Sequence, residues 1–184
     1  MNRIGRVLVI ALLAGFSPSI CLAQDPPQNS AQAMHDLRIT FLSASAASLG
    51  FKPTKAYPRV SGVVMDWPIE DTTATIVSAL DGSASLYTTA AFGIIGGSGH
   101  ESVRIAAQRL LRAAEAHHDE AVPTGTYPYP AKGKIRFYFR TFQDVRVIET
   151  DAASAYSPSG RYSSLFRTGQ AVLTELRKVV EARR

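Results

Sequence analysis

Residues 73–87, TATIVSALDGSASLY, decide the fold class of the chain. The run 73–80 is rich in β-branched residues, which favour strands. Asp81-Gly82 follows it, and a second strand-like run, 83–95, comes directly after. An Asp-Gly pair between two such runs is the strongest short-range signal for a β-hairpin. The stretch therefore predicts two antiparallel strands joined by a tight turn.

Further strands are predicted on both sides of this hairpin. Residues 59–67, RVSGVVMDW, precede it, and Pro68 marks a boundary between the two runs. Residues 134–142 and 145–150 read as a second hairpin, with Gln143-Asp144 as its turn. This turn would place Arg136 opposite Asp151 and Tyr138 opposite Glu149.

Helices are predicted where apolar residues recur at a spacing of three or four, over 31–49, 99–118 and 164–182. The resulting order is α-β-β-β-α-β-β-α. Short turns between consecutive strands imply antiparallel pairing. We therefore expect an α+β fold, with an antiparallel sheet of about five strands and helices packed on one face.

The N-terminus has the three parts of a secretory signal peptide. Arg3 and Arg6 form a basic start, residues 7–16 form a short apolar core, and a small-residue cleavage site ends at Ala23. The residues before Cys21 fit poorly to a lipid-attachment motif, so the mature chain is predicted to begin at Gln24. We expect export to the periplasm or the medium. The predicted organisation is a signal peptide at 1–23, a flexible start, helix and linker at 24–55, and one domain at 56–184.

Composition narrows the classes of function. Cleavage after Ala23 would remove the single cysteine and lower the formal charge from +5 to +3, because Arg3 and Arg6 are lost. That charge is too small to indicate nucleic-acid binding. No later segment is long and apolar enough to span a membrane. No motif indicates a cofactor.

The glycine-rich turn at 96–101, GGSGHE, allows competing interpretations. It lacks the lysine of a P-loop, the spacing of a dinucleotide fingerprint and the last glycine of a nucleophile elbow. The favoured interpretation is a capping box, in which the Ser98 hydroxyl accepts from the Glu101 N–H and Glu101 reaches back. The alternative is an anion or ligand site formed by four residues: Gly97, Ser98, Gly99 and His100. It requires His100 and Glu101 to share a pocket with a distant polar residue, such as Arg136, Tyr87 or His35.

Two adjacent histidines, His117 and His118, precede Asp119 and Glu120 near the end of the second predicted helix. Neighbouring side chains on a helix point about 100° apart, so the two imidazoles cannot face one ion. We therefore predict a solvated helix end and no metal site.

The sheet face opposite the helices is the predicted binding surface. Side chains alternate along a strand, so Phe137 and Phe139 would face the helices, and the other parity would face solvent. The residues expected on this exposed face are Tyr138, Arg140, Arg136 and Tyr87. Tyrosine and arginine are enriched at binding surfaces. The leading hypothesis is a non-catalytic binding or accessory protein for an unknown protein or small ligand. The alternative is a small enzyme or anion-binding protein centred on the 96–101 turn.

Three stretches, DGSASLY, GIIGG and HESVR, together resemble a group of bacterial proteins of uncharacterised function. The resemblance covers about residues 60 to 180. It implies one folded domain, and it implies no activity, ligand or site.

Overall fold

The computed structural model describes residues 27–182. The predicted signal peptide and cleavage site lie outside these residues. The elements follow in the order α1 (Pro27–Ser43), β1 (Val60–Ile69), β2 (Thr72–Ala79), β3 (Ala84–Thr88), β4 (Gly93–Ile94), η1 (Gly97–Gly99), α2 (Glu101–Ala116), η2 (His118–Glu120), β5 (Val122–Pro123), β6 (Lys134–Thr141), β7 (Val145–Asp151), α3 (Ala152–Tyr156) and α4 (Ser163–Glu181). The strands form one sheet in the order β4-β3-β2-β1-β6-β7-β5, and every pair is antiparallel.

The Asp81-Gly82 hairpin is confirmed. β2 pairs with β3, and the Gly82 N–H donates to the Ala79 carbonyl across the turn. Gly82 has a φ of +81°, a left-handed conformation that glycine adopts without a Cβ clash. The Asp81 carboxylate accepts from the Ser83 N–H, which fixes the turn further.

The sheet has seven strands where the sequence predicted about five. The sequence predicts one strand over 83–95, but the chain turns back after Thr88 and returns as β4. The Thr88 hydroxyl accepts from the Phe92 N–H, and Ala91 has a φ of +62°. No glycine marks this turn. Three elements are too short to leave a periodic pattern in the sequence, namely the two-residue strands β4 and β5 and the five-residue helix α3.

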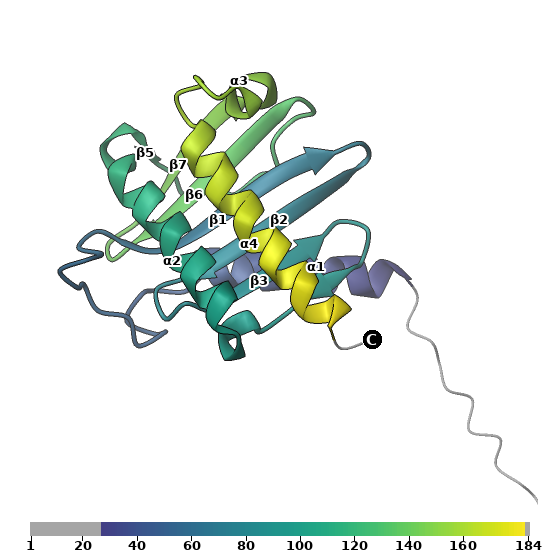
Figure 1. Cartoon of the computed structure of the whole chain (residues 1–184), viewed down its shortest axis with the longest axis horizontal. Helices are drawn as coiled ribbons and strands as arrows, with labels where there is room; N and C mark the ends of the chain where they lie inside the picture. The colour runs from purple at the N-terminus through teal and green to yellow at the C-terminus, as the bar shows by residue number, and fades with distance from the viewer. Residues whose placement is uncertain (1–26, 183–184) are drawn as a thin grey trace, which may run out of the picture.

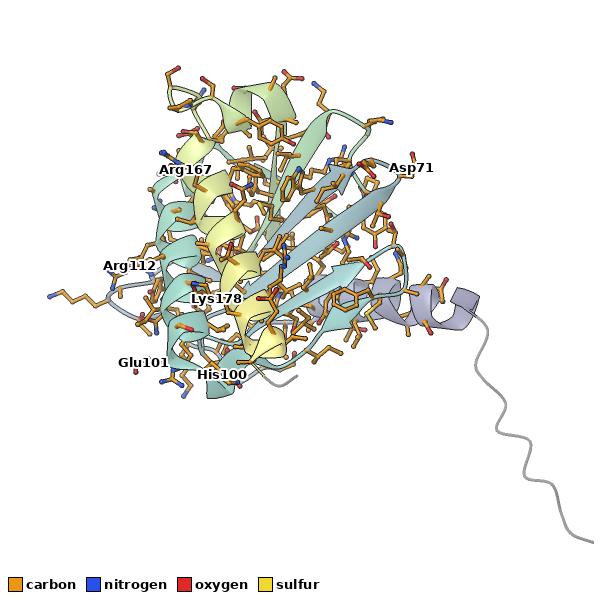
Figure 2. All side chains as sticks on the ribbon, turned by 45° about the vertical axis from the view of Figure 1, so that its right-hand side comes forward. Asp71, His100, Glu101, Arg112, Arg167 and Lys178 are labelled. Carbon is orange, nitrogen blue, oxygen red and sulfur yellow. The ribbon has the colours of Figure 1, made fainter. Side chains whose placement is uncertain are left out.

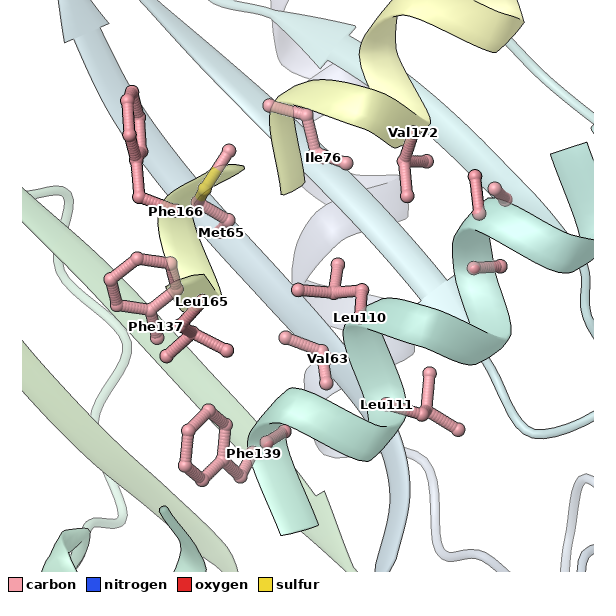
Figure 3. Close-up of a cluster of buried hydrophobic side chains, with 14 of the residues drawn as sticks. Val63, Met65, Ile76, Leu110, Leu111, Phe137, Phe139, Leu165, Phe166 and Val172 are labelled. Atoms are coloured by element: carbon pink, nitrogen blue, oxygen red, sulfur yellow. The ribbon is translucent and has the colours of Figure 1, made fainter. Parts of the chain in front are cut away.

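One face of the sheet carries the larger core, beneath α2 and α4 (Figure 1). Side chains of the two helices fill the space above β1, β2 and β6, as Figure 3 shows. Leu110 and Leu165 are fully buried against Val63 and Phe137. Burial of this apolar surface is the main driving force of folding.

The other face is covered by α1, which crosses behind the sheet in Figure 1. A second core lies there, built from Leu42 of α1 together with Val64, Val77, Tyr87, Tyr138 and Val145. The expectation of helices on one face alone was wrong. α1, which the sequence places in the N-terminal part at 24–55, packs through Leu42 against residues of the sheet.

The second hairpin is confirmed with a different register. β6 pairs with β7 so that Arg136 lies opposite Glu149 and Lys134 opposite Asp151. The turn is centred on Phe142-Gln143, because the Thr141 N–H donates to the Asp144 carbonyl. The predicted turn lay one residue later, which shifted every cross-strand pair by two.

Candidate functional site

The predicted exposed face is buried. Tyr138 is 0%, Arg140 1% and Tyr87 7% exposed, and only Arg136 of the four candidates retains substantial contact with solvent. The expectation of exposure was wrong because α1 and the segment 124–131 cover this parity of the sheet. Val64 and Val77 share the face, and their burial requires such a cover.

A buried ion pair holds α1 to the sheet. Arg38 and Asp66 are both fully buried, and Arg38 donates to the two carboxylate oxygens through Nε and Nη2. The Thr75 hydroxyl donates to the same carboxylate at 2.6 Å, and Arg38 Nη1 donates to the Tyr127 carbonyl at 2.8 Å. Burial raises the pKa of Asp66, and the hydrogen bonds from Arg38 and Thr75 act against that shift. All three nitrogens of this guanidinium are therefore used.

The guanidinium of Arg140 is also buried, but one of its nitrogens lacks a hydrogen-bond acceptor. Its Nη2 donates to the Ala44 carbonyl, and its carbon lies 4.7 Å from the centre of the Phe41 ring. Its Nη1 is buried and has no hydrogen-bond partner in the part of the chain that the structure describes. No carboxylate among residues 27–182 forms an ion pair with it. Burial lowers the pKa of Arg140. A buried charged donor without a partner is costly, and such groups concentrate at functional sites.

Arg140 lines a cleft of about 330 Å³, which we call the Arg140 cleft. Three segments form it, namely the end of α1 and the turn after it, the start of the 124–131 segment, and the turn between β6 and β7. Its lining residues are Leu42, Ser43, Ala44, Ser45, Ala46, Thr124, Tyr127, Arg140, Thr141, Phe142, Gln143, Asp144 and Val145. The volume lies at the small end of the range for small-molecule sites.

The β6–β7 turn forms a fixed wall of this cleft. The Thr141 hydroxyl donates to Asp144 Oδ1 at 2.6 Å and accepts from the backbone N–H groups of Gln143 and Asp144. Arg146 Nε lies 3.5 Å from Asp144 Oδ2, and Arg146 Nη1 donates to the Ala121 carbonyl. Thr141 and Arg146 therefore both hold Asp144 in the turn, and the backbone N–H groups of Gln143 and Asp144 already have an acceptor.

The 96–101 turn does not form the predicted capping box. Gly97–Gly99 is a 3₁₀ turn, α2 begins at Glu101, and the N-cap residue His100 makes no side-chain cap hydrogen bond. Ser98 takes part through its carbonyl, which accepts from Arg104 Nη1 at 3.0 Å. Gly97 is buried where a Cβ would lie 2.7 Å from Val103 and 2.8 Å from Leu176. Packing thus accounts for the glycine at position 97.

The alternative site around His100 is not assembled. His100 and Glu101 lie at the outer end of α2 (Figure 2). The partners that this interpretation required lie on the opposite side of the sheet, because Tyr87 belongs to the core under α1. His35 is on α1 and contacts Tyr129, and Arg136 donates to the Pro128 carbonyl.

The two adjacent histidines have separate carboxylate partners. His117 Nδ1 lies 3.0 Å from Glu120, and His118 Nδ1 lies 3.0 Å from Asp119. These contacts lower the pKa of both carboxyl groups. Between residues 27 and 182 no group of three or more His, Cys, Asp or Glu side chains is placed to hold a metal ion. In the same part of the chain no helix has the length and apolar character needed to cross a membrane.

Comparison with known proteins gives no match: no family model, no curated protein and no solved structure is similar to this chain. The resemblance to a group of bacterial proteins stays a prediction.

Proposed function

We propose that the protein is an exported, non-catalytic binding protein that holds a small anionic ligand in the Arg140 cleft. The observation that carries the proposal is Arg140, a buried guanidinium that lines the cleft and whose Nη1, itself buried, has no hydrogen-bond partner within residues 27–182. An anion bound in the cleft against this guanidinium would supply the missing negative charge, and an acceptor once the side chain turns Nη1 toward the cleft. Charge-assisted hydrogen bonds of this kind are about twice as strong as neutral ones.

Packing alone does not account for an arginine at position 140. The neighbours of its side chain include the Phe41 ring and Val145, which an apolar side chain would contact equally well. The bond to the Ala44 carbonyl uses Nη2 and leaves Nη1 unsatisfied. Arg38 shows the contrast, because on the same face of the sheet each of its nitrogens has an acceptor.

The test is the thermal unfolding of the purified protein with rising concentrations of sodium acetate, chloride and phosphate. A ligand at ten times its Kd stabilises the folded state by about 1.4 kcal/mol. For a domain of this size that is a rise in Tm of about 3 to 6 °C. Arg140→Met should abolish the rise. Arg112→Met is the matched control, because Arg112 is exposed on α2 (Figure 2) and should leave the response unchanged.

A second variant blocks the cleft without changing the buried Arg140. Ser43 is exposed at the rim of the cleft, so Ser43→Trp should narrow the opening without changing the core. Loss of the anion response in both cleft variants supports the proposal. An equal response in wild type, Arg140→Met and Ser43→Trp contradicts it, because the anions would then act elsewhere on the protein.

A further inference from the structure

We infer that the ligand of the Arg140 cleft is an apolar monocarboxylate of about ten heavy atoms in all, with one carboxylate group on a hydrocarbon body. This inference rests on the proposed function and names the class of molecule that the same site would take. The charge, the donors and the walls of the cleft each support this ligand class.

The charge of the cleft matches a single negative charge. Of the side chains that line it, Arg140 is the only cation and Asp144 the only anion. The Asp144 carboxylate is held at the turn by Thr141 and faces Arg146 at 3.5 Å. A dianion such as a phosphate ester would meet one guanidinium and, close by, a fixed carboxylate. One carboxylate neutralises Arg140 and brings no surplus charge toward Asp144.

The free donors of the cleft suit a carboxylate better than a phosphate. Phosphate sites commonly combine several backbone N–H groups at glycine-rich turns or helix N-termini. No glycine lines this cleft, and the N–H groups of Gln143 and Asp144 already donate to the Thr141 hydroxyl. The side-chain donors of the cleft also include the Ser43 and Tyr127 hydroxyls and the Gln143 amide, but Arg140 is the only charged one, and its Nη1 carries two N–H bonds on one nitrogen. A carboxylate can accept both with its two oxygens or with one.

Part of the wall of the cleft is apolar, and the polar side chains of Ser43, Ser45, Thr124 and Gln143 lie beside that part. Leu42, Ala46 and Val145 contribute aliphatic surface and are buried, and Tyr127 and Phe142 contribute aromatic rings. Water occupies about 30 Å³ per molecule in the liquid, so a volume of about 330 Å³ holds roughly ten heavy atoms. Removal of an apolar body of this size from water adds affinity that a bare anion lacks.

The chemistry could come from a free acid or from the C-terminus of a peptide with an apolar last residue. Isothermal titration of the wild-type protein separates the two with 3-phenylpropionate as the free acid and N-acetyl-Ala-Ala-Phe as the chain terminus. Three compounds are controls: 3-phenylpropanamide is the neutral isostere, acetate is a carboxylate without the large apolar group, and inorganic phosphate is the dianion.

The expected result is that 3-phenylpropionate or the peptide binds at least tenfold more tightly than acetate, phosphate or the amide. Arg140→Met and Ser43→Trp should each weaken that binding at least tenfold, with far-UV circular dichroism confirming that both variants are folded. Phosphate binding that is tighter than carboxylate binding and is lost in Arg140→Met would overturn the ligand class and leave the proposed function intact. No heat from any anion would overturn both.

Discussion

Asp66→Asn is expected to be one of the most destabilising single substitutions in the domain. The Asp66 carboxylate is fully buried and accepts hydrogen bonds from Arg38 and Thr75. An asparagine keeps the shape, but it removes the charge and turns an NH₂ group toward donors of Arg38. The guanidinium is then left buried without a counter-ion. Breaking a buried ion pair from one side costs about 3–5 kcal/mol.

The size of the domain converts this cost into a measurable shift. At about 2–4 °C per kcal/mol for a chain of this length, Tm should fall by roughly 6 to 20 °C. Thermal unfolding followed by circular dichroism, with urea unfolding at 25 °C to obtain the free energy, measures the change. Asp36→Asn is the matched control, because Asp36 is exposed on α1, the helix that carries Arg38, and its side chain accepts from Gln32. Its free energy of unfolding should change by less than about 0.5 kcal/mol.

The double variant Arg38→Met with Asp66→Leu tests whether the unpaired buried charge causes the loss of stability. Replacement of both partners by apolar groups leaves no buried charge, and such replacements are often neutral or stabilising. The double variant should therefore recover most of the stability lost in Asp66→Asn. A free energy of unfolding for Asp66→Asn within about 1 kcal/mol of wild type would refute the account of how α1 is held.

The glycine turn and the end of α2 give three further predictions. Gly97→Ala should lower stability by about 1–3 kcal/mol in urea unfolding, because its Cβ would overlap Val103 and Leu176, whereas Gly99→Ala, with open space around it, should not. Ser98→Ala should change stability by less than about 0.5 kcal/mol, because the side chain caps no helix. A loss of about 1 kcal/mol would instead support the predicted capping box. The folded-state pKa values of Asp119 and Glu120 lie below their ordinary values of 3.8 and 4.5. Their stabilisation is therefore present above about pH 4.5 and lost as pH falls below it, and the variant with Asn and Gln at these positions should show a flatter Tm profile from pH 5 to 3.

The sequence predicted those parts of the fold that depend on local signals. The Asp81-Gly82 pair has one favoured backbone conformation, so the hairpin could be recognised from two residues and their flanks. The apolar stripes of α2 and α4 indicated helices because their spacing matches one face of a helix. The short strands β4 and β5 form only because a longer strand lies beside each, which no local pattern records.

The candidate site depended on burial, which alternation alone does not determine. A period of two shows that Tyr138 and Arg140 share a face, but not whether that face is covered. One signal was available in residues 59–67, where Val60, Val63, Val64 and Met65 make an almost continuous apolar run. Such runs are typical of strands buried on both faces. Asp66, an acid inside this run, indicated a buried partner, and Arg38 of the first helix is that partner.

A titration of the ¹⁵N-labelled protein with 3-phenylpropionate tests whether Arg140 is held for an anion. Amide and arginine side-chain shifts are followed by NMR, with Arg140→Met used to assign the Arg140 side-chain signal. We expect the largest changes on that signal and on the amides of Ala44, Gln143 and Val145, which line the cleft. Changes concentrated at Ser98 to Glu101, with the Arg140 signal unmoved, would contradict this expectation and place the ligand at the N-terminus of α2.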